Sequence, residues 1–287
     1  MSRIYIVIVI LILTAGNSFL SAQTDSTAEG LYKITLSDGS NYIGSILAET
    51  QYAISIKTIT NIDMTIPKNQ IKSMIKHTGE ILFGESYRAD PNRTRLFFAP
   101  TARSLKSGQG YFSDYEIFFP MLAVGIADVV TLAGGMSLIP GASEQALYFA
   151  PKITALHLEK FDLAGGVLYI HIPDDESFNF GIAYGVATIG TERASLTCGL
   201  GWGFAEGEFA NEPIILLGGE LRASNSIKFI TENWIPPSSD VVLCSFGIRF
   251  FGDQLAADLG LLTPLGGRTE GFPFIPWVGF VYNFGIE

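Results

Sequence analysis

Large apolar residues alternate with small ones along residues 178–206, as in Phe178, Phe180 and Ile182, and again in Leu200 and Trp202. A period of two is typical of β-strands, whose successive side chains point to opposite faces. A soluble sheet would carry charged residues on its second face, whereas glycine and alanine occupy that face here. Large residues facing lipid and small ones facing an interior are what a closed membrane barrel requires. The pattern therefore predicts transmembrane strands with the large residues outward.

Strand-like segments of this kind continue to the end of the chain, each roughly ten residues long, which suits a tilted membrane strand. The fold class that we predict is all-β, with an antiparallel transmembrane barrel over residues 92–287. We expect twelve strands, with ten as the alternative, and short turns alternating with longer loops. The expected strands are 94–102, 112–126, 129–139, 147–158, 162–172, 178–190, 194–206, 213–223, 227–235, 240–251, 255–263 and 273–284.

The first 22 residues have the pattern of a signal peptide. Arg3 supplies a positive charge, an apolar stretch runs over residues 4–14, and small residues lead to a cleavage site after Ala22. The alternative is an uncleaved anchor helix. We expect an exported protein of the cell outer membrane, with both ends of the barrel in the periplasm.

Between the leader and the barrel lies a small domain. Residues 31–76 contain five short alternating segments, and Asp38-Gly39 between two of them is a strong hairpin signal. A linker follows at 77–91. The segments 34–40 and 42–46 resemble small SH3-like or Sm-like barrels, which implies a five-stranded SH3-like module in the periplasm. The RNA binding of Sm-like rings is not expected here, because the chain is acidic.

Composition narrows the class of function. The mean hydropathy is +0.32, yet no apolar run after residue 20 is long enough for a membrane helix. A net charge of −10 argues against nucleic acid as a partner. No zinc-ligand spacing or phosphate-binding glycine loop is present, so we expect no cofactor and no metal. Cys198 and Cys244 are expected to face lipid without forming a disulfide.

The last strand carries a recognisable pattern. Residues 277–284 end in a glycine, two residues, an aromatic, one residue and a second aromatic, at Gly279, Tyr282 and Phe284. This resembles the C-terminal assembly signal of bacterial outer-membrane barrels, except that three residues follow the last aromatic. The resemblance implies the barrel assembly machinery and outer-membrane lipid as partners.

A second resemblance covers residues 90–287. The segment from Asn92 to Phe112 is similar to the start of barrels in uncharacterised exported proteins of Bacteroidota-like bacteria. It implies location and architecture, and no known activity comes with it.

Charged residues on the inward parity of the strands are the candidate site. They form either a selectivity ring in a channel or ion pairs that brace the lumen, and mixed signs on neighbouring strands favour bracing. These lumen charges are Arg95, Glu116, Lys152, Glu220, Arg222, Lys228, Glu232, Arg249 and Asp258.

An enzymatic site is the less favoured interpretation. His171 lies beside the acidic loop 174–177, near the expected outer rim, where a lipid-modifying site would be placed. No Gly-x-Ser-x-Gly elbow accompanies it, and His157 and His77 lie elsewhere. The acidic run at 174–176 could also bind Ca²⁺.

We therefore predict an outer-membrane barrel that acts as a narrow pore or binding barrel without enzymatic activity. Two alternatives stay open: a lipid-modifying enzyme with a rim site near His171, and a membrane anchor whose module at 31–76 docks a periplasmic protein or the cell wall. A soluble lipocalin-like protein is a third, which the low charge of the small-residue face disfavours.

Overall fold

The computed structural model describes residues 30–77, 81–82, 85–86, 88–173, 178–237, 239–266 and 274–285. The expected signal peptide and the acidic loop 174–177 lie outside these residues. The chain divides into two compact units, the first ending at Ala89 and the second covering Asp90–Ile286. None of the described helices has the length and hydrophobicity needed to cross a membrane.

The first unit contains a five-stranded antiparallel sheet in the order β4-β3-β2-β1-β5. Its core is formed by Ile34 and Leu36 of β1, Ile54 and Ile56 of β3, and Ile66 of β4. The SH3-like character of this unit stays a prediction. Its elements are β1 (Leu31–Leu36), β2 (Asn41–Glu49), β3 (Ala53–Thr58), β4 (Asp63–Pro67), the 3-10 helix η1 (Lys68–Gln70) and β5 (Ile71–Lys76), followed by the short pair β6 (Ile81–Leu82) and β7 (Glu85–Ser86).

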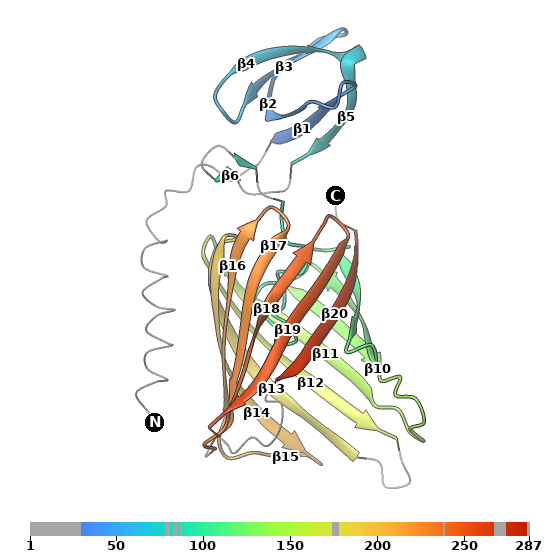
Figure 1. The fold of residues 1–287 in the computed structure, drawn as a ribbon, viewed down its shortest axis with the longest axis vertical. Coiled ribbons are helices and arrows are strands. Elements are labelled where there is room, and N and C mark those ends of the chain that lie inside the picture. The colour runs from blue at the N-terminus through green and yellow to red at the C-terminus, as the bar shows by residue number, and fades with distance from the viewer. Residues whose placement is uncertain are drawn as a thin grey trace. The chain divides into compact units, whose positions relative to one another are not determined.

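The second unit is a closed antiparallel barrel of twelve strands (Figure 1). Neighbouring strands pair in chain order, and β20 closes the ring by pairing with β8. The barrel strands are β8 (Gly110–Tyr115), β9 (Phe119–Ile126), β10 (Val130–Met136), β11 (Leu147–Leu158), β12 (Phe161–Ile172), β13 (Phe178–Gly190), β14 (Ala194–Ala205), β16 (Ile214–Ser224), β17 (Ile227–Ile235), β18 (Val242–Phe251), β19 (Leu255–Leu265) and β20 (Ile275–Phe284), and the two-residue β15 (Glu208–Phe209) pairs only with β14.

The two ends of the barrel differ. At one end, here called the turn end, β8 begins and β20 finishes, and the intervening connections are short: 127–129, 159–160, 191–193, 225–226 and 252–254. The opposite end, here called the loop end, has the tight turn 116–118 and the longer connections 137–146, 173–177, 206–213, 236–241 and 266–274.

The predicted count of twelve strands is right, but two of the predicted segments are wrong. Residues 94–102 form no strand, and the predicted strand 112–126 is two strands, β8 and β9, joined by a turn. Glu116 and Ile117 in that turn have positive φ angles of 51° and 69°, a conformation that breaks a strand. The two errors cancel in the total.

The expected outward orientation of the large residues holds for β14 and β20. Leu200, Trp202 and Phe280 are exposed on the outer wall, while Thr197 on the other face of β14 is fully buried. For β13 the orientation is reversed. Val186 and Thr188 are buried on its inner face, so Phe180, Ile182 and Tyr184, which share that parity, also face the lumen.

Neighbouring strands explain how β13 can present small residues outward. The Phe204 ring of β14 lies over Gly181, where a Cβ atom would come within 2.6 Å of the ring, and it stacks on Tyr169 of β12. Large outward side chains on both sides thus cover part of the glycine and alanine stripe. How deeply the inward side chains are buried depends on what fills the lumen. The alternation of residues along a strand gives no information about that filling.

Candidate functional site

Residues 90–109 form what we call the lumen segment, which lies inside the barrel except at Lys106, Ser107 and Gly108, which are exposed (Figure 1). The segment hydrogen-bonds to strands all around the ring: Ala102 N–H donates to Thr188 Oγ1 of β13, and Phe98 N–H donates to Glu232 of β17. It starts beside Asn283 near the turn end, and Ser107 returns to that end at Asp128. The segment is therefore a hairpin that enters from the turn end and leaves there.

The tip of the lumen segment packs into an apolar layer halfway along the barrel. Leu96, Phe97, Ala99 and Ala102 are buried against side chains of four wall strands, Ala164, Val186, Leu216 and Ile230. Gly218 of β16 provides the space for Leu96, because a Cβ atom there would lie 2.1 Å from Leu96 Cδ1. This fit closes the bore at the middle of the barrel.

Buried ion pairs join the lumen segment to the wall. Arg95 Nη1 lies 2.6 Å from Asp258 Oδ2, and Arg249 Nε lies 2.7 Å from Asp258 Oδ1, so one carboxylate holds two guanidinium groups. Arg103 Nη1 lies 3.2 Å from Glu220 Oε2. Buried charges are tolerated only when they are paired in this way, so the network specifies where the segment sits.

Two further wall residues hold the segment through its backbone. Lys152 Nζ donates to the carbonyl oxygens of Thr94, Thr101 and Arg103 at 3.1, 2.8 and 2.6 Å. Glu232 Oε2 accepts the N–H groups of residues 98 and 99, each at 3.0 Å. Because these contacts use main-chain atoms, they depend on the path of the segment rather than on its side chains.

A cluster of charges lies where the segment enters. Lys228 Nζ is 3.1 Å from Asp90 Oδ2, 3.2 Å from Glu192 Oε2 and 3.4 Å from Glu220 Oε1. Burial acts to raise the pKa of Glu192, but the charges of Lys228, Arg103 and Arg93 outweigh it and lower that pKa to about 2. The pKa of Asp90 is lowered in the same way by Lys228 and Arg249, against its burial. Both carboxylates are ionised at neutral pH.

The structure places the predicted lumen charges as follows. Glu116 is not in the lumen: it lies in the turn between β8 and β9, where its carboxylate accepts the Val278 N–H at 2.9 Å. Arg95 belongs to the lumen segment rather than to a wall strand. The others are buried on inward positions of wall strands: Lys152, Glu220, Arg222, Lys228, Glu232, Arg249 and Asp258.

Sequence reasoning missed the partners that complete the network. Asp90 lies in the predicted linker 77–91, and the predicted lumen charges do not include Arg103, Asp162 or Glu192. The available signal was the charge balance. The predicted lumen set contains five cations and four acids, so complete pairing required at least one acid from outside that set.

The loop-end half of the lumen is different in chemistry. Above the tip, inward positions carry aliphatic and aromatic side chains, and these are only half-buried although they face the interior. The Phe98 ring at the tip is 44% exposed. This half of the lumen is therefore accessible rather than filled. Its walls include Leu168, Ile170, Phe180, Ile182, Trp234, Leu243, Leu262 and Trp277.

The histidines do not form a recognisable catalytic arrangement among the described residues. His171 Nδ1 lies 2.8 Å from Asn179 Oδ1, which also accepts a hydrogen bond from Tyr169. His157 pairs with Asp162 near the turn end. In the part of the chain that the structure describes, no group of three or more His, Cys, Asp or Glu side chains could hold a metal ion.

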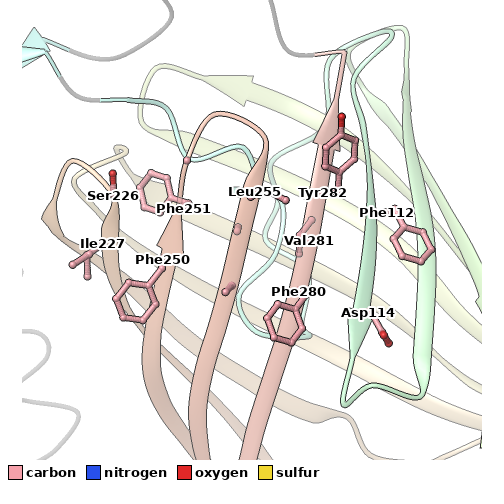
Figure 2. A pocket seen from close by; sticks show the side chains of 13 residues that line it. Phe112, Asp114, Ser226, Ile227, Phe250, Phe251, Leu255, Phe280, Val281 and Tyr282 are labelled. Carbon is pink, nitrogen blue, oxygen red and sulfur yellow. The ribbon is translucent and has the colours of Figure 1, made fainter.

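A groove of about 620 Å³ lies on the outer wall near the turn end (Figure 2). The aromatic rings of Phe112, Phe250, Phe280 and Tyr282 line it, and the small residue Ala257 pairs with Phe250 on one neighbouring strand and with Phe280 on the other. Its 13 lining residues include no histidine or cysteine, and its walls are almost wholly apolar. The groove is an apolar depression of the outer surface.

No family model and no curated protein matches the chain. A KdgM porin in complex with disordered oligogalacturonate is 9% identical, with 61% of this chain and 98% of that chain covered and a TM-score of 0.46. OmpT, an outer membrane protein of Vibrio cholerae, folded in vitro, is 11% identical, with coverage of 88% and 94% and a TM-score of 0.34. The barrel fold is established by the closed ring of strands, in which β20 pairs with β8.

Proposed function

We propose that this protein is an outer-membrane β-barrel that serves as a binding barrel or narrow pore without enzymatic activity. The observation that carries the proposal is the lumen segment, which blocks the bore of a barrel whose outer wall is apolar. An outer wall of exposed Phe, Leu, Ile and Val side chains on a closed ring is the surface that lipid requires. Lipid and the barrel assembly machinery are the implied partners, the latter through Gly279, Tyr282 and Phe284.

The turn end is proposed to face the periplasm. Short periplasmic turns and longer outer loops are the rule in outer-membrane barrels, and the connections here have that asymmetry. The small unit at 31–76, which precedes the lumen segment in the chain, is then periplasmic as well.

The paired charges favour a brace over a selectivity filter. Cations and carboxylates meet in the turn-end half of the lumen, and they hold the lumen segment instead of lining an open path of one sign. Ion flow would require displacement of the segment. We therefore expect the resting protein to conduct poorly.

Two measurements test this proposal. Membrane fractionation with a heat-modifiability gel should place the protein in the outer membrane and give different migration for unboiled and boiled samples. In planar bilayers, the native protein should show little conductance, and a variant with residues 94–102 replaced by a Gly-Ser linker of equal length should show discrete large openings. A protein that fractionates as soluble, or equal conductance of both forms, would contradict it.

A docking role for residues 31–76 is the second candidate. It is favoured by exposed apolar side chains on that unit, Tyr52, Ile62 and Ile75. A photo-crosslinking group at position 52 should capture a single periplasmic protein or peptidoglycan in cells. A matched group at Lys57 on the same sheet should capture neither.

A further inference from the structure

The two halves of the lumen differ in how far they are filled. Inward residues toward the turn end, such as Thr188, Lys228 and Arg249, are buried by the lumen segment. Inward residues toward the loop end, such as Leu168 and Ile182, are half-buried, and the Phe98 ring beneath them is 44% exposed. Accessible space therefore exists inside the barrel between the tip of the segment and the loops, which we call the vestibule.

The vestibule wall is apolar. Among the described inward positions on the loop-end side of Glu232, no Lys, Arg, Asp or Glu occurs. Four strands in particular supply aliphatic and aromatic side chains to it, with Leu168 on β12, Ile182 on β13, Leu243 on β18 and Leu262 on β19. A porin lumen for sugars or ions would be polar, so this wall suits a different kind of ligand.

Unpartnered donors lie at the floor of the vestibule. Tyr115 Oη, Trp277 Nε1, and Arg95 Nε and Nη2 are buried with no hydrogen-bond partner among the described residues. Arg95 and Tyr115 are only 2% and 4% exposed, and a buried donor without a partner costs free energy. Such groups indicate a missing acceptor.

These donors belong to one cluster around Phe98. The Arg95 guanidinium lies 5.2 Å from the centroid of the Tyr115 ring, and the centroids of the Tyr115 and Trp277 rings are 6.0 Å apart. The Phe98 ring packs edge-on against both, at 6.0 and 6.5 Å. Phe98 therefore packs against the two rings that carry the Tyr115 and Trp277 donors.

We propose that the vestibule binds an amphipathic carboxylate of the fatty-acid class. The alkyl chain lies along the apolar wall, and the carboxylate accepts hydrogen bonds from Tyr115 and Trp277 after the Phe98 ring turns aside. The positive charge of Arg95 beneath Tyr115 favours an anionic head group over a cationic one. This inference rests on the proposed function, because it requires the vestibule to be open at the loop end of a folded barrel.

Tryptophan fluorescence provides the test. Trp202 faces outward, whereas Trp234 and Trp277 face the lumen, so Trp202→Phe leaves only lumen reporters. The full chain with this substitution, folded in detergent micelles, is titrated with 12-bromododecanoate, whose bromine quenches nearby indole. The expected result is saturable quenching, with binding of the matching trimethylammonium amphiphile at least about tenfold weaker.

Three lumen variants and one outer-wall control locate the binding site. Tyr115→Phe should weaken binding of the carboxylate about tenfold, the effect of one lost hydrogen bond to a charged group, while Tyr282→Phe on the outer wall should not. Leu168→Glu should abolish saturable quenching. Phe98→Ala, which alters no wall strand, should strengthen carboxylate binding because it uncovers the donors.

Several results would overturn the proposal. Quenching that rises without saturation, equal affinity for both amphiphiles, or no effect of Tyr115→Phe and Phe98→Ala would each do so. Heat-modifiability of the same samples, together with membrane fractionation of cells that express the protein, distinguishes failure of the ligand proposal from failure of the proposed function. A correctly folded, membrane-located barrel that binds no carboxylate contradicts only the ligand, whereas loss of the folded band or of the membrane location contradicts the proposed function.

Discussion

Arg249 and Asp258 face each other across β18 and β19 inside the barrel, with Arg249 Nε 2.7 Å from Asp258 Oδ1 and both side chains fully buried. The same guanidinium donates to the main-chain carbonyl oxygens of Asn92, Arg95 and Leu96. This pair therefore links the barrel wall to the segment that closes it, and stability and closure of the lumen depend on the same contacts.

Removal of the shared carboxylate should destabilise the barrel strongly. Asp258→Ala leaves Arg95 and Arg249 buried without it, and breaking a buried pair in this way costs about 3–5 kcal/mol. The measurement is urea unfolding of the protein in lipid vesicles. As a control, Glu49→Ala removes the exposed Lys68–Glu49 pair and should change stability by only about 0–1 kcal/mol. An unchanged midpoint for Asp258→Ala would refute the structural importance of the pair.

Loss of the Lys152 ammonium should loosen the lumen segment without removing it. Lys152→Met keeps the apolar stem but deletes three hydrogen bonds to carbonyl oxygens of the segment. We expect frequent transient openings in planar bilayers, at a conductance below that of the Gly-Ser replacement. Lys160→Met, in the turn between β11 and β12, is the matched control and should leave the recording closed. A closed Lys152→Met protein would mean that the side-chain ion pairs alone hold the segment.

The ion pairs of Lys228 with Asp90 and Glu192, which hold the start of the lumen segment at the turn end, should break in acid. Glu192 has a pKa of about 2 in the folded protein against an ordinary value of 4.5, so its stabilising contribution is present above pH 4.5 and is lost as the pH falls toward 2. Asp90 has a lowered pKa and acts in the same direction. Reaction of an introduced cysteine, Ser104→Cys, with a water-soluble maleimide should accelerate over this range. When Glu192→Gln is added to Ser104→Cys, the acceleration should be smaller. A reaction rate of Ser104→Cys alone that does not change with pH would contradict a role of these ion pairs in holding the segment.

Gly218 should be intolerant of a side chain. In Gly218→Ala the new methyl group would lie 2.1 Å from Leu96 Cδ1, so Leu96 must move, and overpacking of this kind costs about 1–3 kcal/mol. Gly185→Ala is the matched control on β13, because its Cβ atom would meet nothing within 4 Å. Urea midpoints of the two variants provide the comparison. Equal midpoints would indicate that Leu96 has free space beside it.

Several features of this protein could be read from local pattern. The alternation of large and small residues predicts strands, and the turn residues separate most of them correctly, because side-chain period and turn chemistry are properties of short segments. The total of twelve strands is right only because two errors cancel: 94–102 is predicted as a strand and is none, and 112–126 is predicted as one strand and is two, divided by the turn at Glu116 and Ile117. That turn carries no glycine, so nothing in its composition indicates a positive φ.

The residues that the wall strands contribute to the candidate site could be predicted, whereas the residues that the lumen segment and the turns contribute could not. Inward charges such as Lys228 and Arg249 follow from strand parity, whereas the acids that pair with them, Asp90 and Glu192, lie outside the strands and meet them only in the folded barrel. The predicted orientation was also wrong for β13, whose large residues were expected to face lipid, because Ile182 faces the lumen. Pattern gives two faces to a strand but does not say which of two apolar environments, lipid or a vestibule, each face meets.

The amino-acid sequence by itself therefore determined the all-β class and the places of ten of the twelve barrel strands, because alternation and turn formation depend on residues close together in the chain. Only the tertiary structure decided that residues 90–109 fold back into the barrel and close half of it. That outcome depends on contacts between residues far apart in the chain, such as Arg95 with Asp258 and Leu96 with Gly218, which exist only when the ring is closed.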